Sequence, residues 1–288
     1  MTPIAASGPN AEQIEYWNSV RAQRWVELQE RMDALIEGFG ARALERAELA
    51  AGERAIDVGC GCGATSLALA GRVGARGRVL GVDVSSQMLA RARERARSAA
   101  LSNVEFVDGD AQTHAFDAGA WDCVFSRFGV MFFADPARAF ANLRRALRRG
   151  GRVSFACWRA LPENPWVTVP FAALAKVVAP PPPPPPPGAP GPFSFGDPER
   201  VRGILSEAGF AEIELTPHDG PLTLGTDLDD AVEFALTAGP ASRLLEGASA
   251  SDRARARDVV REALAPHARG GAVALTGAIW LVRASNPG

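Results

Sequence analysis

The first fifty residues place apolar side chains at helical spacing. The apolar positions of this stretch are Ile14, Trp17, Val20, Trp25, Leu28, Met32, Leu35 and Ile36. Positions three and four apart share one face of a helix, so residues 12–35 are predicted to be helical until Gly38 and Gly40 interrupt the pattern. A second helix is expected near residues 41–49, ending at Gly52.

Short apolar runs then alternate with helical stretches. Strands are predicted at residues 54–58, 78–82, 104–107, 121–126 and 152–157. Helices are predicted at residues 64–70, 88–100 and 136–147, the last with a proline in its first turn. This alternation predicts an α/β fold whose doubly wound, mostly parallel sheet carries helices on both faces.

The pattern becomes irregular after Trp158. Eight consecutive prolines occupy residues 180–187. They predict a polyproline II segment about 25 Å long, at roughly 3.1 Å per residue. Further helices are expected at residues 198–208, 228–237 and 251–265, and further strands at residues 211–215 and 272–282.

These patterns divide the chain into four segments of one domain. We expect an N-terminal helical lid (1–50), a glycine-rich core (51–157), a proline-rich insertion (158–197) and the C-terminal half of the sheet (198–288). The last segment carries a helical insertion at residues 217–271. The insertions and the N-terminal helices are expected to form a lid over a substrate.

The charge balance argues against several classes of protein. The 288 residues carry 31 basic and 33 acidic side chains, a formal net charge of −2. A near-neutral chain lacks the positive field that binds nucleic acid, and no apolar run approaches the ~20 residues that span a bilayer. The N-terminus lacks the basic and apolar regions of a signal peptide, and four cysteines do not make a disulfide framework. We expect a cytoplasmic protein, monomeric or homodimeric, with neither nucleic-acid nor membrane partners.

A glycine loop follows the first predicted strand. Gly59, Gly61 and Gly63 stand at alternate positions, where they allow a sharp turn and bring backbone N–H groups close to a ligand. The same loop satisfies a dinucleotide-binding fingerprint, so it leaves a nicotinamide cofactor open. The intervening Cys60 and Cys62 lack a second cysteine pair, so no metal site is expected.

Three carboxylates at the tips of predicted strands narrow the choice of cofactor. Asp57 precedes the loop by two residues, where it would repel a pyrophosphate and attract a cation. Asp83 could accept hydrogen bonds from both hydroxyls of a ribose. Asp110 and the backbone amide of Ala111 could read the amino group and a ring nitrogen of adenine. Together they suit adenosine joined to a sulfonium amino acid, S-adenosyl-L-methionine (SAM).

Four motifs occur in order at fitting spacing. They are residues 55–65 (AIDVGCGCGAT), 79–89 (VLGVDVSSQML), 104–112 (VEFVDGDAQ) and 126–133 (SRFGVMFF). The chain thereby resembles class I SAM-dependent methyltransferases, and within them the ubiquinone/menaquinone C-methyltransferase-like (methyltransferase type 11) small-molecule subgroup. The resemblance is strong over residues 50–157, and residues 277–282 (GAIWLV) resemble the family's last strand.

The resemblance implies a seven-stranded Rossmann-like sheet with an antiparallel last strand. It also implies roles for individual residues. Asp57, Gly59, Gly61 and Gly63 would bracket the methionine part of the cofactor, Asp83 would hold the ribose, Val84 and Met88 would flank adenine, Asp110 and Ala111 would read its edge, and Ser126 would complete the cofactor site. S-adenosyl-L-homocysteine would be the product.

The expected reaction is an in-line displacement that moves the sulfonium methyl to carbon, oxygen or nitrogen of a small molecule, quinone-like or a natural product. Alignment in a dry site would supply most of the catalysis, and His114, Arg127 and Tyr16 are the candidates for catalytic contacts. A nicotinamide-dependent oxidoreductase, an RNA or protein methyltransferase, and a SAM-binding protein without transferase activity remain alternatives.

Two further groups of side chains have less specific expectations. Phe128, Met131, Phe132 and Phe133 could wall an apolar pocket, with core packing expected for at least two of them. The arginines at positions 91, 93, 95 and 97 are expected to form a solvated helix face.

Overall fold

The computed structural model describes residues 4–178, 186, 188–238, 240–245 and 247–288. The chain divides into two compact units. The first comprises Met1–Trp158, Gly188–Pro217 and Ile279–Gly288, and the second comprises Arg159–Pro187 and His218–Ala278. The second unit therefore overlaps the two segments that were expected to be insertions.

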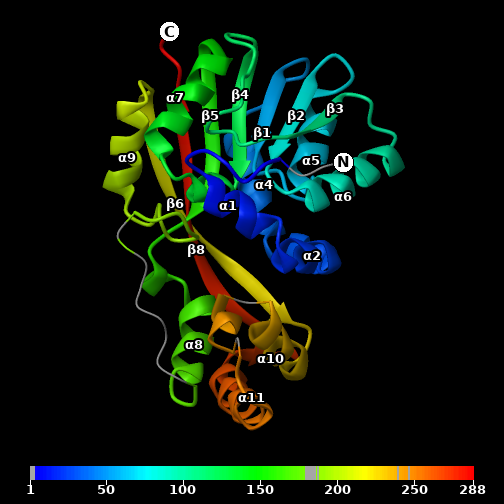
Figure 1. The fold of residues 1–288 in the computed structure, drawn as a ribbon, viewed down its shortest axis with the longest axis vertical. Coiled ribbons are helices and arrows are strands. Elements are labelled where there is room, and N and C mark those ends of the chain that lie inside the picture. Colours follow the sequence, from blue (N-terminus) through cyan, green and yellow to red (C-terminus); the bar gives the residue numbers. More distant parts are fainter. Residues whose placement is uncertain (1–3, 179–185, 187, 239, 246) are drawn as a thin grey trace. The chain divides into compact units, whose positions relative to one another are not determined.

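The first unit is organised around a sheet with the strand order β3-β2-β1-β4-β5-β8-β6 (Figure 1). The strands of this path are β1 (Arg54–Val58), β2 (Arg78–Asp83), β3 (Val104–Asp108), β4 (Trp121–Arg127), β5 (Leu147–Trp158), β6 (Ala211–Gly225) and β8 (Ala272–Ser285). Strands β1 to β5 pair in parallel, and β8 pairs antiparallel to β5. The expected fold class is confirmed.

Two details of the sheet differ from the sequence expectation. A two-residue strand, β7 (Ala268–Arg269), pairs with β8 and brings the strands in the described residues to eight. Strand β6 continues to Gly225, well beyond the predicted end at residue 215. Its burial alternates along most of its length, as in a strand with one solvated face, and this extension takes up the start of the predicted 217–271 insertion.

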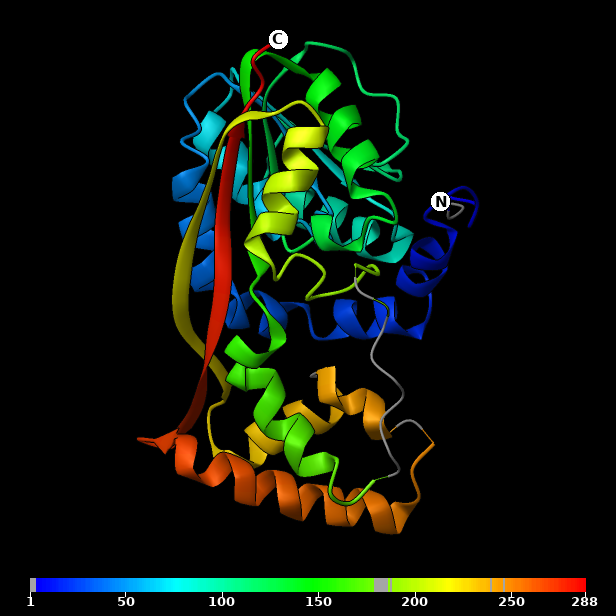
Figure 2. The same cartoon turned by 90° about the vertical axis from the view of Figure 1, so that its left-hand side faces the viewer.

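Helices cover both faces of the sheet in the first unit (Figure 2). They include α5 (Ala64–Val73), α6 (Ser86–Ser98), α7 (Pro136–Ala146) and α9 (Pro198–Glu207). Helices α6, α7 and α9 begin at Ser85, Asp135 and Asp197, whose side chains accept a hydrogen bond from the first turn. The core between helices and sheet is apolar and includes the fully buried Phe125 and Phe155.

The N-terminal region differs from the predicted pair of helices. It forms α1 (Ala11–Trp17), α2 (Val20–Glu27), α3 (Gln29–Leu35) and α4 (Glu37–Arg46). The predicted break at Gly38 and Gly40 is wrong, because both lie inside α4. A Cβ at position 40 would lie 3.1 Å from Cδ of Arg127, so Gly40 provides room for that side chain.

The second unit contains α8 (Pro165–Leu174), α10 (Leu228–Thr237) and α11 (Ala250–Leu264), and α11 packs against both of the other helices. The helices predicted at 228–237 and 251–265 are confirmed, whereas α8 had no sequence prediction. Asn164, fully buried, begins α8, and its Oδ1 accepts the backbone N–H of Ala278 at 2.9 Å. The predicted polyproline II segment lies almost wholly outside the described residues.

Within the part of the chain that the structure describes, no helix has both the length and the apolar character that crossing a bilayer requires.

Candidate active site

The glycine loop lies at the carboxyl end of β1, where its three glycines have left-handed backbones. Their φ angles are 67° at Gly59, 52° at Gly61 and 83° at Gly63, a conformation that costs most other residues free energy. The amide of Gly59 donates to the carbonyl of Val82 (2.8 Å), and Gly63 stands at the N-cap of α5. The loop therefore turns the chain directly from strand into helix.

The end of β4 packs against this loop backbone to backbone. A Cβ on Gly59 would lie 2.7 Å from Cα of Gly129. Ser126, buried at the same strand end, donates its hydroxyl to the carbonyl of Val58 (2.8 Å) and accepts from the amide of Gly129 (3.1 Å). Ser126 thus holds the turn against the glycine loop.

Asp57 is fully buried beneath the loop. Its Oδ2 accepts hydrogen bonds from the hydroxyls of Thr65 (2.7 Å) and Ser66 (2.6 Å) in the first turn of α5. Its Oδ1 has no hydrogen-bond partner among the described residues. Burial raises the pKa of Asp57 to about 6, although those two hydroxyls and the charge of Arg127 oppose the rise. A cation beside Oδ1 would favour the ionised form.

Asp83 ends β2 and supports the same loop. Its Oδ2 accepts the amide of Gly61 and its Oδ1 accepts the amide of Ser85, both at 2.8 Å. Burial raises the pKa of Asp83, and these backbone hydrogen bonds oppose the rise. Each carboxylate oxygen can accept a second hydrogen bond, so Asp83 retains acceptor capacity. Nearby, Val84 is half-buried and Met88 is buried, with its sulfur close to Gly61.

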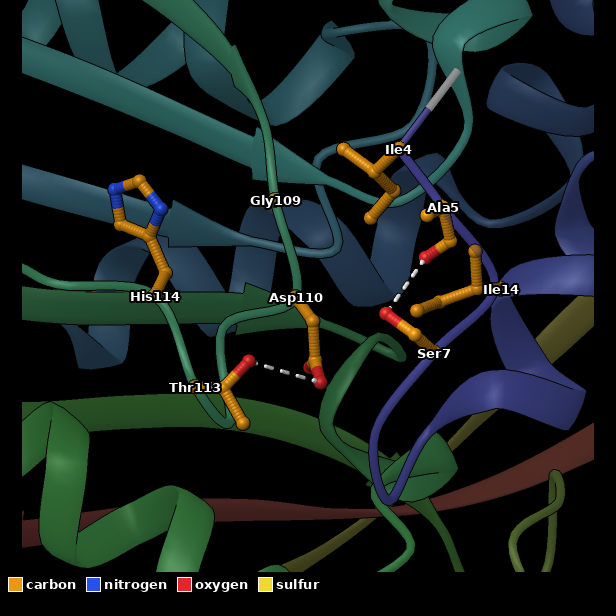
Figure 3. Close-up of a pocket in the computed structure, with 8 residues that line it drawn as sticks. All are labelled: Ile4, Ala5, Ser7, Ile14, Gly109, Asp110, Thr113 and His114. Atoms are coloured by element: carbon orange, nitrogen blue, oxygen red, sulfur yellow. Dashed lines mark hydrogen bonds between the residues drawn. The ribbon is translucent and has the colours of Figure 1, made fainter.

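Asp110 lies beyond the end of β3 and lines a pocket of about 270 Å³ (Figure 3). Ile4, Ala5, Ser7 and Ile14 come from the N-terminal segment, and Gly109, Asp110, Thr113 and His114 come from the segment after β3. Asp110 is 8% exposed, and its Oδ1 accepts from the amide of Gln112 and the carboxamide of Asn10, both at 3.0 Å. Ala111, beside it, is buried. The N-terminal segment therefore completes a pocket at the β3 end.

Two asparagines that the sequence analysis did not single out attach α1 to these strand ends. Besides its bond to Asp110, Asn10 accepts the amide of Ala134 at its Oδ1 (2.7 Å). Asn18 donates to the carbonyl of Val84 (2.8 Å) and accepts from the amide of Ser86 (3.3 Å). Each of these hydrogen bonds joins residues more than 60 positions apart, so a local sequence pattern does not predict it.

The three catalytic candidates lie on different elements. His114 lines the pocket at the β3 end, where desolvation lowers its pKa. Arg127 ends β4 and donates to Asp33 of α3 at 3.1 Å. Tyr16 lies in α1 with its ring edge-on to Trp17. Since β2 and β1 separate β3 from β4, about three strand spacings (~14 Å) lie between the ends that carry His114 and Arg127.

The prediction of a solvated arginine face on α6 is wrong for two of its members. Arg95 donates to the carbonyl of Cys62 in the glycine loop (2.8 Å) and pairs with Asp33 (3.1 Å). Arg93 pairs with Asp108 at the end of β3 (2.8 Å). Arg95 thus supports the glycine loop, and Arg93 supports the end of β3.

The segment after β4 contains both buried and half-buried apolar side chains. Met131 and Phe133 are buried, whereas Phe128 and Phe132 are half-buried. In the described residues, no group of three or more histidine, cysteine, aspartate or glutamate side chains could hold a metal ion.

This arrangement defines a class of protein. A parallel sheet with an antiparallel final strand carries a glycine loop and three successive carboxylates at its carboxyl ends, where open α/β sheets bind their ligands. That combination is the nucleotide-binding half of a Rossmann-like methyltransferase.

Similarity to known proteins supports this assignment to the methyltransferase class. The family described as "Methyltransferase domain" matches residues 55–151. Aklanonic acid methyltransferase DauC of Streptomyces sp. (strain C5) is 36% identical over 117 residues, which are 41% of this chain and 53% of DauC. The match thus spans about half of that relative. Demethylmenaquinone methyltransferase of Staphylococcus epidermidis is 30% identical over 171 residues, 56% of this chain and 69% of the relative.

A solved structure shares the fold. Phosphoethanolamine N-methyltransferase 2 of Haemonchus contortus, in complex with S-adenosyl-L-methionine, superposes with a TM-score of 0.54 at 19% identity, covering 87% of this chain and 53% of that one. The chain belongs to the SAM-dependent methyltransferase family, and the resemblance seen in its sequence is confirmed.

The close approach of the two strand ends predicts that Gly129 tolerates no side chain. Gly129→Ala would bring a Cβ within 2.6 Å of the carbonyl oxygen of Val58 and 2.8 Å of Cα of Gly59. We expect a loss of about 2 kcal/mol in the free energy of unfolding, typical of overpacking, measured by urea denaturation.

Gly71→Ala is the matched control. Gly71 lies in α5 with nothing within 4 Å of the added Cβ, so we expect alanine to stabilise the protein by up to ~1 kcal/mol. Equal effects of the two substitutions would contradict the packing of Gly129 against the loop.

The attachment of α1 predicts a role for Asn10 in cofactor affinity. Asn10→Ala removes a hydrogen bond to a buried carboxylate, which is typically worth ~1.5–3 kcal/mol, and frees one wall of the pocket. We expect the Kd for S-adenosylhomocysteine, measured by calorimetry, to rise about tenfold. Ser7→Ala, which changes the same wall without removing a bridge to Asp110, should leave the Kd within twofold. Indistinguishable Kd values for the two variants would contradict this role.

Proposed function

We propose that this enzyme transfers the methyl group of SAM to a carbon, oxygen or nitrogen nucleophile of a small molecule. The observation that carries the proposal is the Asp57 carboxylate, buried beneath the glycine loop, whose Oδ1 has no partner among the residues that the structure describes. A buried acceptor with a raised pKa favours a cationic ligand over an anionic pyrophosphate. The carboxylates at the next two strand ends continue the site toward a nucleoside.

The proposed cofactor contacts follow the strand ends. Asp57 and the loop residues Gly59, Gly61 and Gly63 hold the amino-acid part. Asp83 accepts hydrogen bonds from the ribose hydroxyls, using the lone pairs that are not engaged by the amides of Gly61 and Ser85. Val84 and Met88 flank the adenine. Asp110 and Ala111 read the adenine edge. We assign Ser126 to positioning, because its hydroxyl already bridges Val58 and Gly129.

When bound, SAM supplies a methyl group that its sulfonium already activates. The chain's own contribution is then to align the acceptor and exclude water. Arg127 would orient an anionic oxygen of the acceptor, since its bond to Asp33 uses one of its five N–H donors. His114 lies at the end that we assign to adenine, so we do not propose it as a base for the acceptor. Tyr16 remains a candidate for substrate contact.

The proposed acceptor is a quinone-like compound or another natural product. The names of the two curated relatives, which refer to aklanonic acid and demethylmenaquinone, support a small-molecule acceptor. The near-neutral net charge of −2 also argues against RNA.

Equilibrium dialysis with labelled SAM and labelled NAD tests the cofactor. We expect SAM to be retained and NAD not, and retention of NAD alone would overturn the proposal. Release of S-adenosylhomocysteine on addition of small quinols, phenols or amines tests the transfer. Methyl transfer to bulk RNA or protein, with none to these acceptors, would favour the alternative methyltransferase class.

The ribose assignment predicts that Asp83→Ala weakens SAM binding by at least about tenfold, because hydrogen bonds to a charged acceptor contribute ~1.5–3 kcal/mol. Glu105→Ala on the neighbouring strand, an exposed residue paired with Arg78, should leave the affinity unchanged. Both affinities are measured by calorimetry. An unchanged Kd for Asp83→Ala would show that the ribose lies elsewhere.

A further inference from the structure

Phe128 has a backbone conformation that its side chain disfavours. Its φ is 63°, in the left-handed region. Glycine and asparagine enter that region readily, whereas a bulky aromatic residue there is an outlier. Such strain gathers at functional sites and persists only where the surroundings enforce it.

The surroundings of Phe128 enforce its conformation. Its amide donates to the carbonyl of Ala156 in β5 (3.0 Å). The residues Arg127 and Phe128 lie between Ser126 and Gly129. The hydroxyl of Ser126 accepts a hydrogen bond from the amide of Gly129, which fixes both ends of this short segment. The chain therefore holds Phe128 in a defined orientation at the carboxyl end of β4.

The ring of Phe128 belongs to a cluster of three aromatic rings. It lies parallel to Trp158, at the end of β5, with ring centroids 4.3 Å apart and planes 10° apart. Phe39 of α4 meets both rings edge-on. Trp158 and Phe39 are 6% and 2% exposed, whereas Phe128 is half-buried. Phe128 is thus the least buried of the three rings.

Phe128 lies between a residue that contacts the glycine loop and the cationic Arg127. Gly129, the next residue, contacts Gly59 of the glycine loop. Arg127, the preceding residue, retains N–H donors beyond its bond to Asp33. An aromatic ring and a guanidinium thus belong to consecutive residues at one strand end beside the loop. Together they match a flat aromatic ligand that bears an ionised oxygen.

Resting on the proposed function, we propose that Phe128 is a specificity-determining residue that positions a planar aromatic acceptor by stacking. The left-handed backbone of Phe128 sets the direction of its ring, and Trp158 and Phe39 pack against that ring. Arg127 orients the anionic oxygen of the acceptor. Aromatic pairs favour such offset or edge-on arrangements.

The test uses 2-hydroxy-1,4-naphthoquinone, a planar anion, as the probe, and calorimetry on the 288-residue protein saturated with S-adenosylhomocysteine. Phe128→Leu keeps an apolar side chain and the backbone strain but removes the aromatic face, so we expect the probe Kd to rise at least tenfold. Phe128→Tyr keeps the face and should stay within threefold of the wild type. Phe132→Leu, at the other half-buried aromatic of this segment, should also stay within threefold.

Two further measurements separate positioning from folding. The Kd for S-adenosylhomocysteine and the melting temperature should match in the wild type and Phe128→Tyr, and the cofactor Kd should be unchanged in Phe128→Leu. Cyclohexanecarboxylate, a nonplanar anion, should bind Phe128→Leu and wild type alike.

Either of two results would overturn the inference while leaving the proposed function intact. One is a wild-type protein that binds S-adenosylhomocysteine but not the probe. The other is equal probe affinity in Phe128→Leu and wild type. Absence of S-adenosylhomocysteine binding by the wild type would instead overturn the proposed function, and the inference with it.

Discussion

The burial of the Asp57 carboxylate is the constraint on which the rest of the site depends. Its Oδ2 is fixed by Thr65 and Ser66, which requires the chain to turn from β1 into α5 within a few residues. Only a loop of left-handed glycines makes so tight a turn at low cost. That loop in turn requires Gly129 to contact it and Asp83 to accept its Gly61 amide. A charge buried without a full set of partners is costly, and among the described residues Oδ1 of Asp57 has none, which supports the proposed binding of a cation beside it.

The N-terminal helices extend this constraint to the edge of the sheet. Asn18 attaches α1 to the end of β2, and Asn10 attaches its start to Asp110 beyond β3. Asp33 of α3 joins Arg95, which supports the loop, to Arg127 at the end of β4. The segment that was expected to be a lid thus attaches to the ends of β2, β3 and β4. These attachments are polar and directional, and the same helices also bury apolar side chains such as Ile14 and Phe39.

The sequence predicted the parts of the fold that local patterns determine. Strands β1 to β4 and helices α5, α6 and α7 were placed within a few residues, because apolar period, caps and glycines mark them. The extension of β6, the helix α8 and the breaks between α1, α2, α3 and α4 were missed. These depend on distant partners, such as Ala278 for Asn164 and Val84 for Asn18. The roles of Asn10 and Arg95 were hidden for the same reason, since each acts across a separation that a single sequence does not reveal.

The pH dependence of SAM affinity tests the central claim most directly, because a cation beside Asp57 must lower its raised pKa. In the free protein Asp57 has a pKa of about 6, so it is ionised at pH 7.5 and mostly protonated at pH 5. The account predicts that the calorimetric Kd of the wild type for SAM is about tenfold higher at pH 5 than at pH 7.5. Asp57→Asn should bind weakly at both, with a clearly smaller change between them, which would come from Asp83, whose pKa burial also raises. Parallel pH dependence in the two proteins would contradict the account.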